Sequence, residues 1–283
     1  MIINVGAAKV NLKRGKACYL YSMGDVGFSG VRHCAESFDT DLAYLEQKLK
    51  DGHEVRILGT GDYLAATSPS ERAALISAKG GAGLYKDTLT KMDESVISDS
   101  DKFVAKLLPF KGRILFLESG HHYYEFSKWS IYAGSNCDKY IAGKLGCEYA
   151  GFVAYVDLEF PQLNHRTRIL AYHGNGNGQL PGSGINRRYK AHQAFSDCDI
   201  VYAGHDNNRG CITTAAFKKN TKGYPSLCEQ RTVAIGSHET AYKIGNNADD
   251  YVEVAVMRPT PTAGNVVTLF EPLGDKMVVR CLI

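Results

Sequence analysis

The chain has 283 residues, of which 44% are hydrophobic and 22% are charged, and its formal net charge is +3. This composition is typical of a soluble globular protein with a sizeable core. There is no polybasic arm or acidic tail, so charge allows a nucleic-acid partner without indicating one, and no run approaches the ~20 apolar residues of a membrane span. We therefore expect one domain over residues 1–283 and no membrane partner, and we leave the oligomeric state open.

The first two thirds of the chain alternate between strand-like and helical patterns. Apolar runs rich in Val, Ile, Leu and Tyr predict strands at 17–23, 54–60, 113–119, 151–160, 166–173 and 198–205. Helical spacing predicts helices at 41–52, 68–80 and 98–110. In the first helix Leu42, Leu45 and Leu49 share one face and Gly52 follows as a C-cap, whereas Ser68 and Pro69 begin the second.

A strand-rich part follows from about residue 211. Strand-like runs separated by turn residues lie at 211–217, 231–237, 251–257 and 266–283, and the sequence "PLGD" within the last run predicts a hairpin turn. Alternating units followed by strands predict a layered α/β sandwich.

The eight cysteines form no C-x-x-C pair and do not cluster, which argues against a zinc knuckle and a disulfide scaffold. We expect reduced, mostly buried thiols. A disulfide that includes Cys34 or Cys137 stays open as an alternative.

Five of the predicted strands end at a glycine beside an aspartate or a histidine. The residues are Asp25, Asp62, His121, His122, His173 and His205. Loops at the carboxyl ends of strands meet to form sites, and glycine lets the backbone turn sharply there. Without a cation the carboxylates would repel each other and several imidazoles would lack partners. The mixed donors suit a divalent transition metal: Mn, Zn, Fe, Ni or Co.

The order of these motifs resembles that of calcineurin-like metallophosphoesterases, including archaeal and phage-type members. The family pattern runs D-x-H, G-D, G-N-H-D/E, H and G-H-x-H. The corresponding stretches are Asp25-Val26-Gly27, Gly61-Asp62, Gly120-His121-His122-Tyr123, His173-Gly174 and Gly204-His205-Asp206-Asn207. The resemblance implies a two-layer β-sandwich flanked by helices (α-β-β-α), with two metals bridged by a carboxylate and water attacking phosphorus. Since residues 1–16 also lack the apolar stretch of a secretory signal, we expect a cytoplasmic protein, in the host-cell cytoplasm if a phage encodes it.

The resemblance assigns the metal ligands residue by residue. Asp62, as the bridging carboxylate, would form one tight site with His121, His173 and His205, where His121 replaces the family's asparagine. Of the other site Asp25 remains, but Gly27 and Asn207 replace two histidines. The remaining donors of that site are Asp25, Asp62 and Asn207. These oxygen donors would favour a second, labile Mg²⁺ or Mn²⁺, or water.

His122 takes the place of the family's catalytic histidine, with Asp25 as the carboxylate expected to orient its imidazole. Tyr123 replaces the usual acid after it. The glycine-rich stretch 173–192 leads into a predicted helix, and we expect Asn175, Arg187 and Arg188 to bind substrate. An equally weighted alternative is a solvated loop and a charged helix face.

The remaining histidines, His33, His53, His165, His192 and His238, match no motif and are expected to be surface or structural, with His33 as the nearest exception because it follows Asp25 closely.

The sequence therefore predicts a metal-dependent phosphoesterase that acts on a phosphoester small molecule or a nucleotide. The alternative is an inactive protein of the same fold that binds a phosphate ligand or serves in an assembly. Which substrate is hydrolysed, and whether it is a monoester or a diester, does not follow from these motifs.

Overall fold

The computed structural model describes residues 3–80, 84–174, 183–195, 197–205, 209–219, 224–239 and 263–283. Within these ranges the side chains of residues 79, 80, 183–185, 187, 188 and 191 are not described. The predicted strand at 251–257 and the predicted site residues Asn175 and Asn207 lie outside the described residues.

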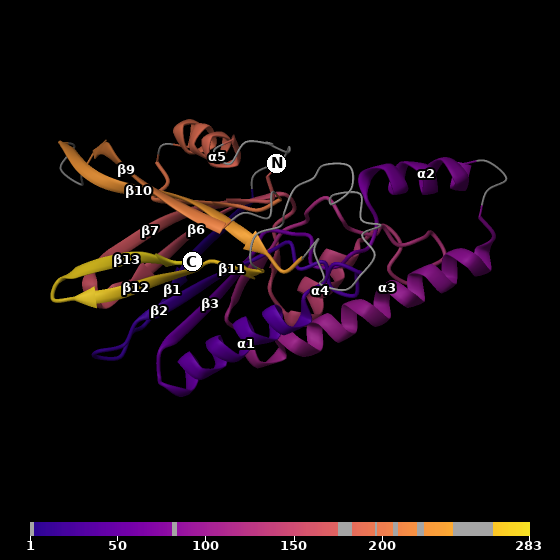
Figure 1. Ribbon diagram of the computed structural model, residues 1–283, viewed down its shortest axis with the longest axis horizontal. Coiled ribbons are helices and arrows are strands. Elements are labelled where there is room, and N and C mark those ends of the chain that lie inside the picture. Colours follow the sequence, from indigo (N-terminus) through magenta and orange to yellow (C-terminus); the bar gives the residue numbers. More distant parts are fainter. Residues whose placement is uncertain are drawn as a thin grey trace, which may run out of the picture.

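Two β-sheets form the centre of the protein (Figure 1). The six-stranded sheet has the order β13-β12-β2-β3-β4-β5. Its strands are β2 (Cys18–Met23), β3 (Glu54–Gly59), β4 (Ile114–Leu117), β5 (Glu148–Tyr149), β12 (Val267–Leu273) and β13 (Lys276–Leu282). Strands β2 to β5 are parallel, whereas β12 and β13 form an antiparallel hairpin at one edge. The hairpin predicted at "PLGD" is thereby confirmed.

The seven-stranded sheet has the order β1-β6-β7-β8-β10-β11, and β9 also pairs with β10. Its strands are β1 (Ile3–Lys9), β6 (Val153–Phe160), β7 (His165–Tyr172), β8 (Ile200–Ala203), β9 (Arg209–Lys219), β10 (Pro225–Ser237) and β11 (Gly264–Asn265). Strands β7, β8 and β10 run parallel to one another. Their carboxyl ends therefore lie at the same edge of the sheet.

The two sheets pack face to face around one apolar layer. Leu20, Leu58 and Phe116 from the six-stranded sheet pack with Val156 and Ile169 from the seven-stranded sheet, and all five are at most 2% exposed. Alternation along β6, in which every second residue is buried, places one of its faces in this layer. The predicted α/β sandwich is confirmed.

Helices cover the outer faces of both sheets (Figure 1). The helices are α1 (Ala35–Lys50), α2 (Pro69–Gly80), α3 (Lys86–Leu107), α4 (Cys137–Leu145) and α5 (Ser183–Ala194). Helices α1, α3 and α4 bury Phe38, Phe103 and Ile141 against the six-stranded sheet. Helix α5 contacts β8 and β10 of the other sheet. The layers thus follow the order α-β-β-α.

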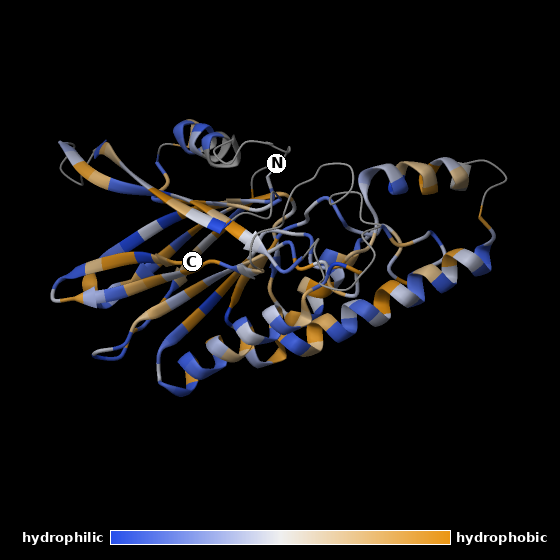
Figure 2. Ribbon diagram, viewed as in Figure 1, coloured by the Kyte–Doolittle hydropathy of each residue, from blue (hydrophilic) through white to orange (hydrophobic). Residues whose placement is uncertain are grey.

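Hydropathy follows this layering. In Figure 2 apolar and polar residues alternate along the strands and along the faces of α1 and α3. Two short 3₁₀ helices, Leu108–Phe110 and Pro161–Leu163, follow α3 and β6. No helix in the described part of the chain has the length and apolar character needed to span a bilayer.

The sequence patterns located the elements but misjudged several limits. Helix α3 begins at Lys86 rather than at 98, because buried Asp93 and Ser100 interrupt its apolar stripe. Asp93 accepts hydrogen bonds from Tyr124 and Ser127, which satisfies its burial. Helix α1 begins at 35 rather than 41, and helix α4 and strand β1 were not predicted.

Helix α2 begins as predicted. Ser68 and Glu71 exchange hydrogen bonds in a capping box, with Ser68 N donating to Glu71 Oε2 at 2.6 Å and Glu71 N donating to Ser68 Oγ at 3.3 Å. All eight cysteines are free thiols, as predicted, but the expectation that most are buried is wrong, because only Cys18, Cys137 and Cys198 are buried and the other five are partly exposed. Cys281 Sγ donates to Cys211 Sγ at 2.9 Å. The single-domain assignment over residues 1–283 stays a prediction.

Candidate metal centre

The predicted site residues follow five strands that end at the same edge of the sandwich. Asp25 follows β2, Asp62 follows β3 and His121 follows β4, and these three strands are parallel neighbours. His173 follows β7 and His205 follows β8, which are parallel neighbours in the other sheet. The topology thereby brings together residues that are far apart in the sequence.

The turns that present these residues have unusual backbone conformations. Asp25, Asp62 and His205 have φ angles of 48°, 54° and 75°. Such left-handed conformations are uncommon for residues other than glycine and tend to occur at functional sites. Three of the five described non-glycine residues with positive φ belong to the predicted site.

Gly61 and Gly120 allow the loops after β3 and β4 to touch. A Cβ on Gly61 would lie 2.2 Å from the backbone nitrogen of Gly120, and a Cβ on Gly120 would lie 2.0 Å from Asp62 Oδ1. Both distances are shorter than real Cβ contacts, so any side chain at either position would separate the loops. These glycines therefore hold Asp62 against the loop that carries His121 and His122.

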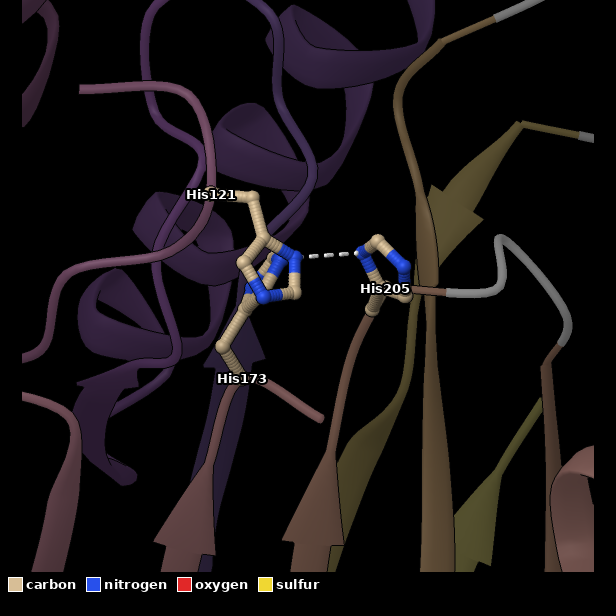
Figure 3. A group of neighbouring side chains, drawn as sticks. All are labelled: His121, His173 and His205. Carbon is tan, nitrogen blue, oxygen red and sulfur yellow. Dashed lines mark hydrogen bonds between the residues drawn. The ribbon is translucent and has the colours of Figure 1, made fainter. Parts of the chain in front are cut away.

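Three imidazole rings form the centre of the site (Figure 3). His121 Nδ1 and His205 Nδ1 are 3.0 Å apart. The ring of His121 lies 4.7 Å from that of His173 and 4.4 Å from that of His205, measured between centroids. One ligand nitrogen from each ring lies within 4.8 Å of the other two, which is close enough for all three to bind one cation.

His173 is the most constrained of the three. Its Nδ1 lies 2.9 Å from the Thr60 carbonyl oxygen, which can only accept, so Nδ1 carries a proton and Nε2 is the nitrogen that a metal ion would bind. Nε2 is buried, lies 3.1 Å from Asp62 Oδ2 and has no hydrogen-bond partner among the described residues. Proteins usually orient a metal-binding histidine by a hydrogen bond from the ring nitrogen that does not bind the metal.

Two buried carboxylates lie beside His173. Asp62 Oδ1 accepts from the backbone nitrogen of His122 at 2.7 Å, and Asp25 Oδ2 accepts from that of His205 at 2.8 Å. One oxygen each of Asp25 and Asp62 and one nitrogen of His173 also lie within 4.8 Å of one another. The other three predicted ligands of the tight site therefore lie beside His173, with His121 and His205 in one ligand-distance group and Asp62 in the other, and their role as ligands stays a prediction.

The pKa values of Asp25, Asp62 and His173 indicate that these buried groups lack positive charge nearby. Burial, together with the nearby charge of Asp62, raises the pKa of Asp25 to about 7. Burial opposes ionisation of Asp62 and of His173, but their mutual attraction outweighs it and lowers the pKa of Asp62 while raising that of His173 to about 9. The donor set thus fits a divalent cation, which would take over the role of the imidazolium.

His122 lies outside both groups of donor atoms. Its side chain is exposed, and its backbone nitrogen donates to Asp62 Oδ1. The Asp25 carboxylate accepts a hydrogen bond from the backbone nitrogen of His205. Orientation of the His122 imidazole by Asp25 stays a prediction.

Arg72, on helix α2, contacts the loop of the candidate site, and the sequence analysis did not single it out. Its Nη1 donates to the carbonyl oxygens of Thr67, His121 and Tyr123 at 2.6, 2.7 and 3.0 Å. Its guanidinium also lies 3.8 Å from the centre of the Tyr123 ring. Arg72 therefore fixes the loop that carries His121 and His122. It belongs to no motif, and only its place on a polar helix face marked it in the sequence.

The other predicted residues lie elsewhere or are not described. Arg187 and Arg188 belong to helix α5, and their role in substrate binding stays a prediction. His33 Nδ1 bonds to the Val26 carbonyl oxygen at 2.9 Å, and its ring packs against Phe28. That contact gives His33 a structural role.

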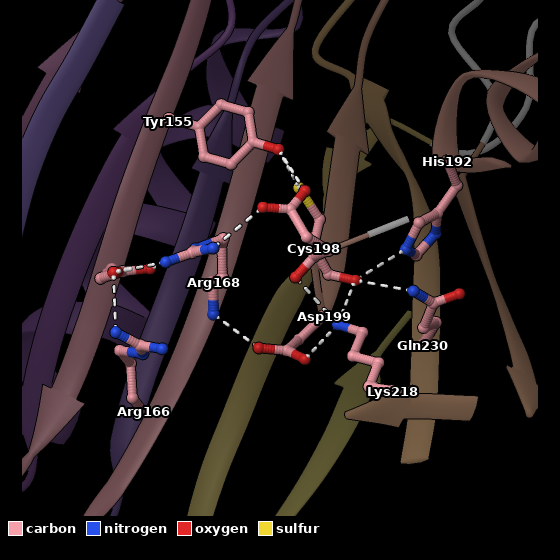
Figure 4. A network of polar contacts seen from close by, with 10 residues as sticks. Tyr155, Arg166, Arg168, His192, Cys198, Asp199, Lys218 and Gln230 are labelled. Atoms are coloured by element: carbon pink, nitrogen blue, oxygen red, sulfur yellow. Dashed lines mark hydrogen bonds and ion pairs between the residues drawn. The ribbon is translucent and has the colours of Figure 1, made fainter. Parts of the chain in front are cut away.

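His192 belongs to a polar network under α5, as Figure 4 shows. Its Nε2 lies 3.1 Å from the carbonyl oxygen of Cys198, which also accepts from Gln230 and Lys218. Arg168 extends the network through ion pairs of 2.9 Å with Asp157 and Asp197. His192 is therefore structural, as predicted.

Comparison with known proteins gave matches among solved structures alone. No family model matches the chain, and no curated protein matches it. The solved structures include vacuolar protein sorting 29 from Cryptosporidium parvum, 15% identical, with 94% of this chain and 97% of that chain covered and a TM-score of 0.40. Vps29 from Chaetomium thermophilum is 9% identical, with 93% and 94% covered and a TM-score of 0.37.

Vps29 from Entamoeba histolytica, solved in complex with Zn²⁺, is 13% identical, with 64% of this chain and 88% of that chain covered and a TM-score of 0.27. Likenesses at this level carry no conclusion about function. The fold described above follows from the sheets and helices of the chain itself.

Proposed function

We propose that the protein is a metal-dependent phosphoesterase of the calcineurin-like metallophosphoesterase family, with one tight site for a divalent transition metal. The proposal depends above all on His173, whose Nδ1 is held by the Thr60 carbonyl oxygen and whose buried Nε2 faces Asp62 beside His121 and His205. Three imidazoles and a carboxylate make a donor set suited to Mn, Zn, Fe, Ni or Co.

In the reaction, the residues of the chain bind and orient the phosphoester and move one proton. A cation held by Asp62, His121, His173 and His205 would supply Lewis acidity towards a phosphoryl oxygen. The exposed imidazole of His122 donates a proton to the leaving oxygen at the mouth of the site. Arg72 keeps His121 and His122 in place by bonding to their loop. The substrate is a phosphoester small molecule or a nucleotide.

The experiment compares two histidines on the same strand. His173 follows β7, and His165 is the first residue of β7, where it bonds to Thr167. Wild type, His173→Ala and His165→Ala would be purified with Mn²⁺ or Zn²⁺, analysed for metal by mass spectrometry, and assayed on an aryl phosphate and an aryl phosphodiester. We expect His173→Ala alone to lose metal and activity. Equal metal content and equal rates in all three would contradict the proposal.

A second candidate function is a protein that binds a phosphate ligand without hydrolysing it. It is favoured by the replacement of two family histidines by Gly27 and Asn207 and of the acid after His122 by Tyr123. Wild-type protein that holds no metal and hydrolyses neither ester would support this candidate over the first.

A further inference from the structure

Glu239 occupies the space that the missing histidine at position 27 leaves open. A Cβ on Gly27 would lie 2.2 Å from Glu239 Oε1 and 2.9 Å from its Cδ. The carboxylate of Glu239 therefore lies where a side chain at position 27 would begin. Gly27 has a φ angle of +57°, so its turn favours glycine in any case.

The backbone holds Glu239 beside Asp25. The carbonyl oxygen of Asp25 accepts from the backbone nitrogen of His238 and from the hydroxyl of Ser237, both at 2.9 Å. The same Ser237 hydroxyl accepts from the backbone nitrogen of Glu239 at 2.9 Å. Glu239 also forms an isolated bridge with His33. The backbone of Glu239 is thus held by Ser237 and by His33.

These contacts place a third carboxylate near two that are already buried, although Glu239 itself lies outside the two ligand-distance groups. Asp25 and Asp62 are 4% and 7% exposed, and each shares a ligand-distance group with His173. Carboxylates that gather in this way repel one another unless a cation lies between them. The buried Nε2 of His173, which lacks a hydrogen-bond partner among the described residues, faces the same space.

We propose that Glu239 takes the place of the missing histidine and completes, with Asp25 and Asp62, a second cation site. Because this site offers mainly carboxylate oxygens, it would take a hard divalent ion, Mg²⁺ or Mn²⁺, more weakly than the histidine site takes its metal. The Glu239 carboxylate lies against Gly27, so binding at this site would require its side chain to rotate towards Asp25. This inference rests on the proposed function, because it places the second ion beside the first.

The test is a titration with Mn²⁺ followed by electron paramagnetic resonance, with no assay of activity. Wild type is expected to bind one ion tightly and a second ion weakly. Glu239→Gln, which keeps the shape and removes the charge, is expected to weaken the second ion at least 10-fold and to leave the first unchanged. Glu229→Gln is the matched control on β10, since Glu229 pairs with Arg231 away from the site.

The outcomes separate this inference from the proposed function. If Glu239→Gln binds both ions as wild type does, or if wild type binds one ion only, the second site is wrong while the phosphoesterase proposal stands. If wild type binds no ion tightly, the proposed function fails first. Thermal unfolding of each variant shows that it is folded.

A reciprocal pair of variants tests whether Glu239 acts in place of a residue at 27. Glu239→Ala is expected to lose the weak ion, and Gly27→His in the Glu239→Ala background is expected to restore it, since the imidazole then enters the vacated space. Histidine is among the residues that more often adopt positive φ. A folded double variant that still lacks the second ion would show that Glu239 does not substitute for that histidine.

Discussion

The two halves of the site differ in their donor atoms although they share the same strand ends. One half holds the imidazoles of His121 and His205, and the other holds the carboxylates of Asp25 and Asp62, with His173 between them. Nitrogen donors select transition metals, whereas carboxylate oxygens also accept Mg²⁺ and Mn²⁺. On the proposed function, the carboxylate half would therefore hold a harder ion, and more weakly, than the imidazole half.

Asp62 is the carboxylate proposed to bridge both halves, so its replacement gives the largest expected effect. Asp62→Asn keeps a residue that tolerates the φ angle of 54° but removes the negative charge. We expect metal content to fall at both halves and the hydrolysis rate to fall at least ~10³-fold. Asp39→Asn, in the surface ion pair with Lys106, is the control. Full activity of Asp62→Asn would contradict the shared role.

His122 separates chemistry from cation binding. Because its imidazole is exposed and lies outside the donor groups, His122→Ala is expected to keep the full metal content while kcat falls about 10²-fold. The measurement pairs metal analysis with the rate on an aryl phosphate, and Glu125→Ala in the same loop serves as the control. Loss of metal together with rate would instead place His122 among the ligands.

Replacement of Arg72 tests the histidine half of the site alone. Arg72→Lys keeps the charge but cannot bond to three carbonyls and stack on Tyr123 at once. We expect about 10-fold weaker metal affinity at the histidine half, by analogy with other residues that orient ligands. Arg56→Lys, on β3 beside Glu54, is the control. Unchanged affinity would limit Arg72 to a stabilising contact.

Replacement of Glu118 is expected to give the smallest effect, which is on the pH dependence of folding stability and not on cation binding. It is fully buried, both of its carboxylate oxygens lack hydrogen-bond partners among the described residues, and burial raises its pKa well above the ordinary value. The folded protein therefore keeps a proton that the unfolded chain loses above the ordinary glutamate pKa. Stability from this group is present at lower pH and is lost as pH rises from that value towards the raised pKa.

Glu118→Gln should remove this dependence. Urea denaturation at several pH values is expected to show the free energy of unfolding of wild type falling, relative to Glu118→Gln, by up to about 1.4 kcal/mol per pH unit. Parallel curves for the two proteins would mean that Glu118 is ionised in the folded state.

The site was predictable from the sequence where a glycine and a donor follow a strand, because parallel strands bring such ends together. Asp62, His121 and His173 were found in this way. Glu239 was not, because it follows no motif and reaches Asp25 only through the backbone bonds of residues 237–238. Helix α3 was placed too late for a comparable reason: the partners that satisfy Asp93 are tertiary contacts.

If a cation binds as proposed, the left-handed turns at Asp25, Asp62 and His205 would couple its binding to the folding of the chain. Each such turn costs on the order of 1–3 kcal/mol, and packing elsewhere in the sandwich offsets that cost. A cation that ties the three residues together returns part of this energy to the folded state and raises the unfolding temperature. On the proposed function, the ion-free chain would then be the less stable form of the protein.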